Sequence, residues 1–344
     1  MTVRALLVND AEAAQMLLAA VLRADDDISV VGVARDGVEA VAMARRLQPD
    51  VVIMDIFMPR LDGVEATKRI MSDCPAPVVV VSASRAIDAA RRCMDAVKAG
   101  AVGILESPLG PRHPDFDRSR RLFADRIKAY ADVQVVSRRP PPLPPAREAL
   151  PSRRPVGAVG IVASTGGPAA LETLLRPLPA DFPAPIFVVQ HMAPGFLAGL
   201  AAWLDDPCAL TVRLAREGEV AAPGTVYVAP EDRHLQLRGE RLGFTDGPPV
   251  GGFRPSADPL LESLATTYGA SAVGIALTGM GRDGVAGLLA LRQAGGFVIA
   301  QDPASCVVHG IPQAAMAAGA TDAQLPLADI APALLLRARL GARP

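Results

Sequence analysis

The chain is 344 residues long, half of it apolar but only 4% aromatic, which predicts two domains with cores of small aliphatic side chains. Its 35 Lys and Arg residues nearly balance 36 Asp and Glu residues, for a net charge of −1, which excludes the global basic field of a nucleic-acid-binding protein. The four cysteines lack C-x-x-C spacing and no run of roughly 20 apolar residues occurs, so we expect a cytoplasmic protein with reduced thiols, no nucleic-acid partner and no membrane insertion.

The first 130 residues alternate short apolar runs with amphipathic stretches of helical spacing. The N-terminus leads straight into the first apolar run, so we expect no signal peptide. We predict strands at Ala5–Val8, Val30–Ala34, Val51–Met54, Val78–Val81 and Gly103–Leu105, and helices near Ala11–Arg23, Gly37–Leu47, Val64–Met71, Ile87–Lys98 and Asp115–Tyr130. Five βα units of this kind predict an α/β domain with a doubly wound parallel sheet.

Polar residues follow three strands of this predicted sheet. Asn9 and Asp10 follow the first strand, Asp55 ends the third and Ser82 ends the fourth. Neighbouring parallel strands bring such side chains to one edge, where clustered oxygens suit Mg²⁺. An aspartate facing that ion could accept a phosphoryl group.

The first domain resembles a response-regulator receiver, a flavodoxin-like fold, over residues 1–130. The resemblance rests on Asp10, on Asp55 with the following Met58-Pro59 and Asp62-Gly63, and on Ser82. It implies that Asp55 is phosphorylated, with a chemotaxis histidine kinase as phosphodonor. It also implies that Asp10 and Asp55 bind Mg²⁺ and that Ser82 is the switch hydroxyl that follows the phosphoryl group.

Two residues depart from the receiver pattern. Asn9 stands where receivers carry the first of two acidic residues, and Ser107 stands where they carry a lysine before proline. The first change removes a negative charge from the metal site, and the second removes a positive charge that would pair with the phosphoryl group. Both weaken the case for efficient phosphorylation of Asp55, and the alternative is a degenerate receiver that acts as a docking and inhibitory domain.

Prolines and arginines dominate the stretch between the two halves of the chain. Seven prolines and five arginines fall within residues 138–155. Such a segment cannot pack as a helix or a sheet, so we predict an extended linker over residues 131–155.

The alternation of strands and helices resumes after the linker. We predict strands at Val159–Ala163, Ile186–Val189, Val226–Val228, Ala272–Leu277 and Phe297–Ala300. We predict helices near Ala169–Leu175, Phe196–Trp203, Ala257–Tyr268, Asp283–Ala294, Pro312–Ala318 and Ala328–Leu340. A hairpin of Leu235–Leu237 and Arg241–Phe244 is predicted around Gly239. The pattern predicts a second α/β domain over residues 156–344, a Rossmann-like doubly wound parallel sheet with a β-hairpin insertion.

A serine at the end of the first of these strands is a candidate nucleophile. Ser164 follows the apolar run Val159–Ala163 and precedes Thr165-Gly166-Gly167-Pro168. A hydroxyl at that sheet edge is exposed, and the helix N-terminus that follows favours developing negative charge. The alternatives are an N-cap serine or a glycine-rich phosphate cradle.

Two further strand ends can complete a triad with Ser164. His191 follows Ile186–Val189 and is a suitable general base, although a structural histidine is the alternative. Asp283, in the glycine-rich stretch after Ala272–Leu277, can orient that imidazole, and its alternative role is a helix N-cap. Backbone N–H groups near Met280 and Gly281, supported by Thr165, are candidates for an oxyanion hole. His234, at the start of the hairpin, is expected to be exposed or capping.

The order Ser164, His191, Asp283 and the local sequences resemble the chemotaxis protein-glutamate methylesterase family, a receiver fused to a hydrolase, over nearly the whole chain. The most specific stretches are Ser164–Pro168, Gln190–Met192, Phe253–Ser256, Leu277–Gly284 and Ala300–Cys306.

This resemblance implies hydrolysis of glutamate γ-methyl esters on the cytoplasmic helices of methyl-accepting chemoreceptors, release of methanol, and deamidation of receptor glutamines. It implies Ser164, His191 and Asp283 as the catalytic residues, no cofactor for catalysis, and control by the receiver domain. The alternatives are a generic serine esterase and a non-catalytic two-domain signalling adaptor.

Overall fold

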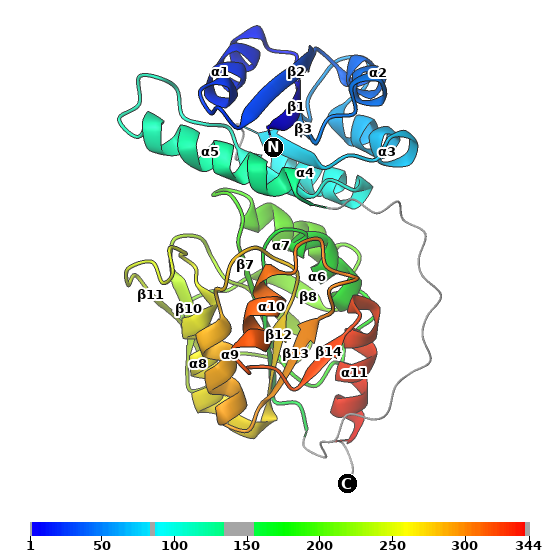
Figure 1. Ribbon diagram of the computed structural model, residues 1–344. Coiled ribbons are helices and arrows are strands. Elements are labelled where there is room, and N and C mark those ends of the chain that lie inside the picture. The colour runs from blue at the N-terminus through cyan, green and yellow to red at the C-terminus, as the bar shows by residue number, and fades with distance from the viewer. Residues whose placement is uncertain (1, 83–86, 134–154, 341–344) are drawn as a thin grey trace. The chain divides into compact units, whose positions relative to one another are not determined.

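The computed structural model describes residues 2–82, 87–133 and 155–340, so most of the predicted linker lies outside the described residues. The chain divides into two compact units, Met1–Pro142 and Leu143–Pro344. Each unit is built on its own parallel sheet, and the predicted class of two doubly wound α/β domains is confirmed (Figure 1). Within the described residues, none of the helices is both long and apolar enough to cross a membrane.

The first unit is a five-stranded parallel sheet in the order β2-β1-β3-β4-β5. Its elements are β1 (Val3–Val8), α1 (Glu12–Arg23), β2 (Ile28–Ala34), α2 (Gly37–Leu47), β3 (Val51–Met54), α3 (Gly63–Asp73), β4 (Val78–Ser82), α4 (Ile87–Ala99), β5 (Gly103–Glu106) and α5 (Phe116–Ala131). Helices α1 and α5 pack together, while α2, α3 and α4 form a second layer (Figure 1). All residues of β3 and β4 are buried, as expected for strands covered on both faces.

The second unit is a seven-stranded parallel sheet in the order β14-β13-β12-β6-β7-β9-β8. Its strands are β6 (Ala158–Ala163), β7 (Ile186–Gln190), β8 (Thr211–Leu214), β9 (Thr225–Val228), β12 (Ala272–Ala276), β13 (Phe297–Gln301) and β14 (Ala323–Leu325). Its helices are α6 (Gly167–Leu175), α7 (Leu197–Asp205), α8 (Ala257–Tyr268), η1 (Gly269–Ser271), α9 (Val285–Gln293), α10 (Gly310–Ala317) and α11 (Leu327–Leu340). Helices α6, α7 and α11 pack in one layer, and α8, α9 and α10 in another (Figure 1).

The predicted hairpin is present as β10 (His234–Arg238) and β11 (Arg241–Thr245), an antiparallel pair separate from the main sheet. It packs on α8, and the Leu237 amide donates to the Ser263 hydroxyl of that helix at 2.9 Å. The hairpin therefore belongs to the same layer as α8.

Two strands were missing from the sequence prediction. They are β8 and β14, which form the two edges of the seven-stranded sheet. Each is short and only partly buried, so neither carries the continuous apolar run that marks a central parallel strand.

Candidate functional site

The carboxyl ends of β6, β7 and β12 meet at one edge of the second sheet. The Ser164 amide donates to the Thr278 carbonyl at 3.1 Å, and the His191 amide donates to the Ala163 carbonyl at 3.0 Å. Because Ala163 pairs with Gln190 in the β6–β7 register, Ser164 and His191 follow directly on adjacent strands. Backbone pairing alone thus brings the candidate nucleophile and the candidate base together.

The turn after Ser164 requires glycine at two positions. Gly166 caps α6 with a φ of +76°, and the Gly167 amide donates to the Ser164 carbonyl at 2.8 Å. A Cβ on Gly167 would lie 2.0 Å from Oε1 of Gln190. Ser164 is therefore held at the N-terminus of α6, where the helix dipole favours negative charge that develops during attack.

Gln190 ties the two strand ends together behind the site. Its Nε2 donates to the Ser164 carbonyl at 2.9 Å and to the His191 carbonyl at 2.8 Å. The side chain is only 2% exposed, so these bonds are shielded from water. Gln190 therefore fixes the backbones of both candidate catalytic residues at once.

Asp283 is the third residue at this edge, and its carboxylate is buried. Its Oδ2 lies 2.9 Å from Nε2 of His191 and accepts from the Ala257 amide at 2.8 Å. Its Oδ1 accepts from the Ser256 hydroxyl at 2.5 Å. Asp283 is not the N-cap of α9, which is Gly284, so the simple capping alternative is wrong for this helix. The carboxylate is instead anchored by the N-terminus of α8.

The imidazole of His191 faces the Asp283 carboxylate and is mostly shielded from water, with 9% of the side chain exposed. Its contact to Asp283 has the length of a hydrogen bond but lacks the alignment of one, and within the described residues neither Nδ1 nor Nε2 has a well-aligned partner. The ring stacks flat on Phe253, with centroids 4.1 Å apart and planes 14° apart. A proton moved from Ser164 to His191 would leave an imidazolium facing the Asp283 carboxylate.

His234 was expected to be exposed or capping, and the exposed alternative is wrong, because this histidine is 1% exposed. Its Nδ1 accepts from the Ser256 amide at 3.1 Å, and its Nε2 contacts the Pro248 carbonyl at 3.1 Å. The neutral tautomer with its proton on Nε2 satisfies both contacts. His234 and Ser256 thus support Asp283. Ser256 lies in the family-specific stretch Phe253–Ser256 and His234 lies beside the predicted hairpin, but no local sequence pattern predicted this role for either residue.

The candidate oxyanion residues lie on the loop that follows β12. A Cβ on Gly279 would lie 2.8 Å from the Cβ of Ser164, so this backbone passes directly beside the nucleophile. Met280 is 41% exposed and Gly281 has a φ of +92°. The Thr165 carbonyl accepts from the Thr278 hydroxyl at 2.9 Å, which joins the two loops. Close backbone approach to the serine is the geometry that an oxyanion hole needs.

In the first unit, Asp55 and Asn9 meet at the sheet edge. Nδ2 of Asn9 donates to Oδ2 of Asp55 at 3.0 Å, and the Ile56 amide donates to Oδ1 at 2.6 Å. Burial raises the pKa of the Asp55 carboxyl, and the negative charge of Asp10 adds to the rise, while the amides of Phe57 and Ile56 oppose it. Asp10 is therefore close enough to Asp55 for their charges to repel.

Asp10 and Asp55 offer a magnesium ion few protein ligands, but enough for the way this ion binds. Among the described residues, no group of three or more His, Cys, Asp or Glu side chains is placed to hold a metal. Mg²⁺ keeps several waters, however, and binds proteins through one or two carboxylates. The mutually repelling pair of Asp10 and Asp55 provides those two, and a cation would relieve the repulsion.

Ser82 and Ser107 lie at the same edge of this sheet, at the ends of β4 and β5. The Ser107 amide donates to the Ser82 carbonyl at 3.2 Å. The Ser82 side chain contacts the Cys93 thiol of α4, and burial raises the pKa of that thiol to about 12. The candidate switch residue Ser82 thus ends the strand beside β3, which leads into Asp55, and Ser107 follows the next strand beyond it.

Comparisons with known proteins match both units. The chain matches the family model "CheB methylesterase" over residues 159–334 and "Response regulator receiver domain" over residues 5–113. It is 48% identical to protein-glutamate methylesterase/protein-glutamine glutaminase 4 of Myxococcus xanthus, over 95% of each chain. It is also 48% identical to protein-glutamate methylesterase/protein-glutamine glutaminase 3 of Anaeromyxobacter dehalogenans, over 97% of this chain and 98% of that one.

A solved structure matches the second unit. It is the Thermotoga maritima CheB methylesterase catalytic domain, with 40% sequence identity and a TM-score of 0.51. The match covers 52% of this chain and 97% of the other. The likeness therefore extends over one entire domain of that protein.

Proposed function

The chain belongs to the CheB methylesterase family, with a response regulator receiver domain in front of the hydrolase domain, and from this we propose its substrate and mechanism. We propose that it hydrolyses glutamate γ-methyl esters on the cytoplasmic helices of methyl-accepting chemoreceptors and deamidates receptor glutamines. The relatives named protein-glutamate methylesterase/protein-glutamine glutaminase, matched over nearly the full chain, support this assignment.

The reaction is acyl transfer through the serine. The Ser164 hydroxyl attacks the ester carbonyl while His191 takes its proton, and methanol leaves with a proton returned by His191. Water then hydrolyses the acyl-enzyme. The observation that carries this mechanism is the placement of His191 beside Ser164 on adjacent strands, with Nε2 at 2.9 Å from the Asp283 carboxylate. That leaves Nδ1, buried and without a partner among the described residues, for the serine proton.

Charge that develops on the ester oxygen needs donors fixed in advance. Backbone N–H groups of Met280 and Gly281 lie on the loop that passes beside Ser164, and Thr165 begins the turn into α6. Preorganised donors of this kind, together with a helix N-terminus, stabilise a tetrahedral intermediate. These steps need no metal.

The receiver domain controls the hydrolase in this proposal. Asp55 is the phosphoacceptor, a chemotaxis histidine kinase is the phosphodonor, and the Ser82 hydroxyl follows the phosphoryl group. When bound by Asp10 and Asp55, Mg²⁺ would neutralise charge on the transferred group. Asn9 and Ser107 leave this site with fewer charges than receivers usually have, so we expect slow phosphorylation. Activation is relief of inhibition by the receiver domain.

One assay tests the catalyst and the switch together. Demethylation of a methylated receptor fragment is measured for the wild type, Ser164→Ala and Asp55→Ala, each with and without acetyl phosphate and Mg²⁺. We expect Ser164→Ala to lose activity by about 10³-fold or more, and the phosphodonor to stimulate the wild type but not Asp55→Ala.

Three outcomes would contradict parts of this proposal. Full methylesterase activity in Ser164→Ala would refute the mechanism. Hydrolysis of a chromogenic ester without receptor demethylation would favour a generic esterase. A wild-type protein that gains no phosphoryl mass from the phosphodonor would refute phosphorylation of Asp55 and leave a docking receiver.

A further inference from the structure

The orientation of the His191 ring is set by packing rather than by hydrogen bonds. Both ring nitrogens lack aligned partners among the described residues, although Nε2 contacts Asp283. The flat contact with Phe253 is the interaction that defines the plane of the ring. A histidine that must face a hydroxyl on one side and a carboxylate on the other cannot rotate freely without losing one of them.

A tight hairpin turn places Phe253 over the imidazole. Val250 and Phe253 exchange two backbone hydrogen bonds, of 3.1 and 3.0 Å, across Gly251 and Gly252. Both central residues have positive φ, +58° and +90°, as in a type I′ turn, which favours glycine at these positions. The turn is separate in sequence from every candidate catalytic residue, so its aromatic side chain reaches His191 only through the fold.

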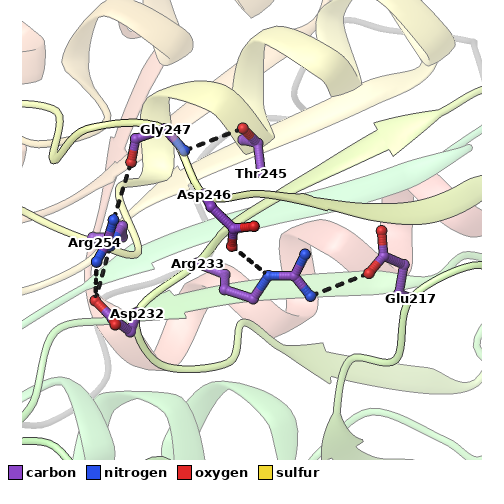
Figure 2. Close-up of polar contacts among 7 residues, drawn as sticks. All are labelled: Glu217, Asp232, Arg233, Thr245, Asp246, Gly247 and Arg254. Carbon is purple, nitrogen blue, oxygen red and sulfur yellow. Dashed lines mark hydrogen bonds and ion pairs between the residues drawn. The ribbon is translucent and has the colours of Figure 1, made fainter.

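Charged contacts hold the base of this turn (Figure 2). The Arg254 guanidinium donates to Oδ1 of Asp232 from Nε at 2.8 Å and from Nη2 at 2.5 Å, and to the Gly247 carbonyl at 3.3 Å. Arg233 lies nearby and pairs with Asp246, the residue before Gly247. Asp232 is largely exposed, so each ion pair alone contributes little to stability. Together they restrict the segment that presents Phe253.

We propose that Phe253 is a positioning residue for His191, a role that rests on the acyl-transfer mechanism proposed above. Its ring has no donor or acceptor and competes for neither imidazole nitrogen, so it fixes the ring plane while Nε2 faces Asp283 and Nδ1 stays free for the serine proton. The face of an aromatic ring also attracts a cation at this distance. Phe253 therefore stabilises the imidazolium that forms during attack more than the neutral ring before it.

The first test measures kcat and KM for receptor demethylation by full-length Phe253→Leu and Phe253→Tyr. We expect Phe253→Leu to lower kcat by about 3- to 30-fold with little change in KM, and Phe253→Tyr, which keeps the ring, to retain most of the activity. Arg254→Gln, which loosens the turn, should lower kcat in the same direction but less. Phe297→Leu is the matched control, because Phe297 also stacks against a cationic side chain, Arg337 at 4.0 Å, but at the start of β13.

A second readout does not depend on the receptor. The ring protons of His191, one of four histidines, carry a ring-current shift from Phe253 in the NMR spectrum, which should vanish in Phe253→Leu and persist in Phe253→Tyr. The rate at which a fluorophosphonate labels Ser164 should fall in parallel with kcat.

The outcomes separate this inference from the function it rests on. A higher KM with unchanged kcat in Phe253→Leu would mean that Phe253 contacts substrate, and an unchanged kcat, labelling rate and NMR shift would mean that it does not position His191. Either result overturns the inference. If instead the wild type fails to demethylate the receptor, the proposed function fails, and the NMR shift and the labelling rate still decide the role of Phe253.

Discussion

Replacing Ser256 by alanine should weaken both the stability of the hydrolase domain and its catalysis. The Ser256 hydroxyl donates to the Asp283 carboxylate at 2.5 Å and accepts from the Asp258 amide as the N-cap of α8. A hydrogen bond to a charged group contributes about 1.5–3 kcal/mol, and loss of an N-cap costs about 1 kcal/mol. Because Ser256 is fully buried, water cannot replace the lost donor, so the free energy of unfolding should fall by about 2–4 kcal/mol.

A double-mutant cycle with Asp283→Ala, which removes both carboxylate oxygens, isolates the bond to the carboxylate, because the cap is lost equally in both backgrounds. Urea unfolding is followed by the fluorescence of Trp203, the single tryptophan, which lies in α7 of the hydrolase domain. We expect a coupling energy of about 1 kcal/mol or more. Coupling within about 0.3 kcal/mol of zero would refute the reasoning. Ser256→Thr, which keeps the hydroxyl, is the control.

Three other predictions concern separate parts of the chain. Gly167→Ala should destabilise the hydrolase domain by about 1–3 kcal/mol in urea unfolding, because the new methyl meets Gln190, and Gln190→Ala should restore part of the loss. Burial raises the pKa of Asp258, and the charge of Asp283 adds to the rise. The carboxyl therefore favours the folded state below its unfolded pKa of 3.8 and loses that contribution as pH rises through its folded pKa. Asp258→Asn should stabilise the protein at pH 7 and progressively less toward pH 3, and a difference in free energy of unfolding between variant and wild type that stays constant across that range would contradict this. Burial raises the pKa of Cys93 to about 12, so iodoacetamide at pH 8 should modify it, by mass spectrometry, only after denaturation.

The sequence was sufficient to predict two of the three candidate catalytic positions from strand ends. Central parallel strands are buried on both faces, so their apolar runs are continuous, and the polar residues directly after each run mark the sheet edge. Ser164 and His191 follow such runs, in β6 and β7, and the register of those strands places them side by side. Asp283 could be found because the glycine-rich loop after β12 has no other carboxylate.

The support behind Asp283 could not be predicted in the same way. Ser256 and Asp283 are 27 residues apart, and His234 and the Ser256 amide are 22 residues apart, with no periodicity that links them. A histidine at the start of a hairpin has the pattern of an exposed residue, and only the packing of the hairpin on α8 buries it. Contacts between layers depend on tertiary packing, which local sequence patterns do not encode.

Two layers of the fold therefore position the candidate triad: the sheet positions Ser164 and His191, and helix α8 positions Asp283. Strand register in the sheet fixes Ser164 and His191 relative to each other, with Gln190 bridging their backbones. The donors that hold Asp283 are the Ser256 hydroxyl and the Ala257 amide at the N-terminus of α8, and His234 of the hairpin accepts from the Ser256 amide. A small shift of α8 would move the carboxylate away from the imidazole while the sheet stayed intact. Loss of activity without loss of secondary structure is thus the expected signature of damage to the α8 layer.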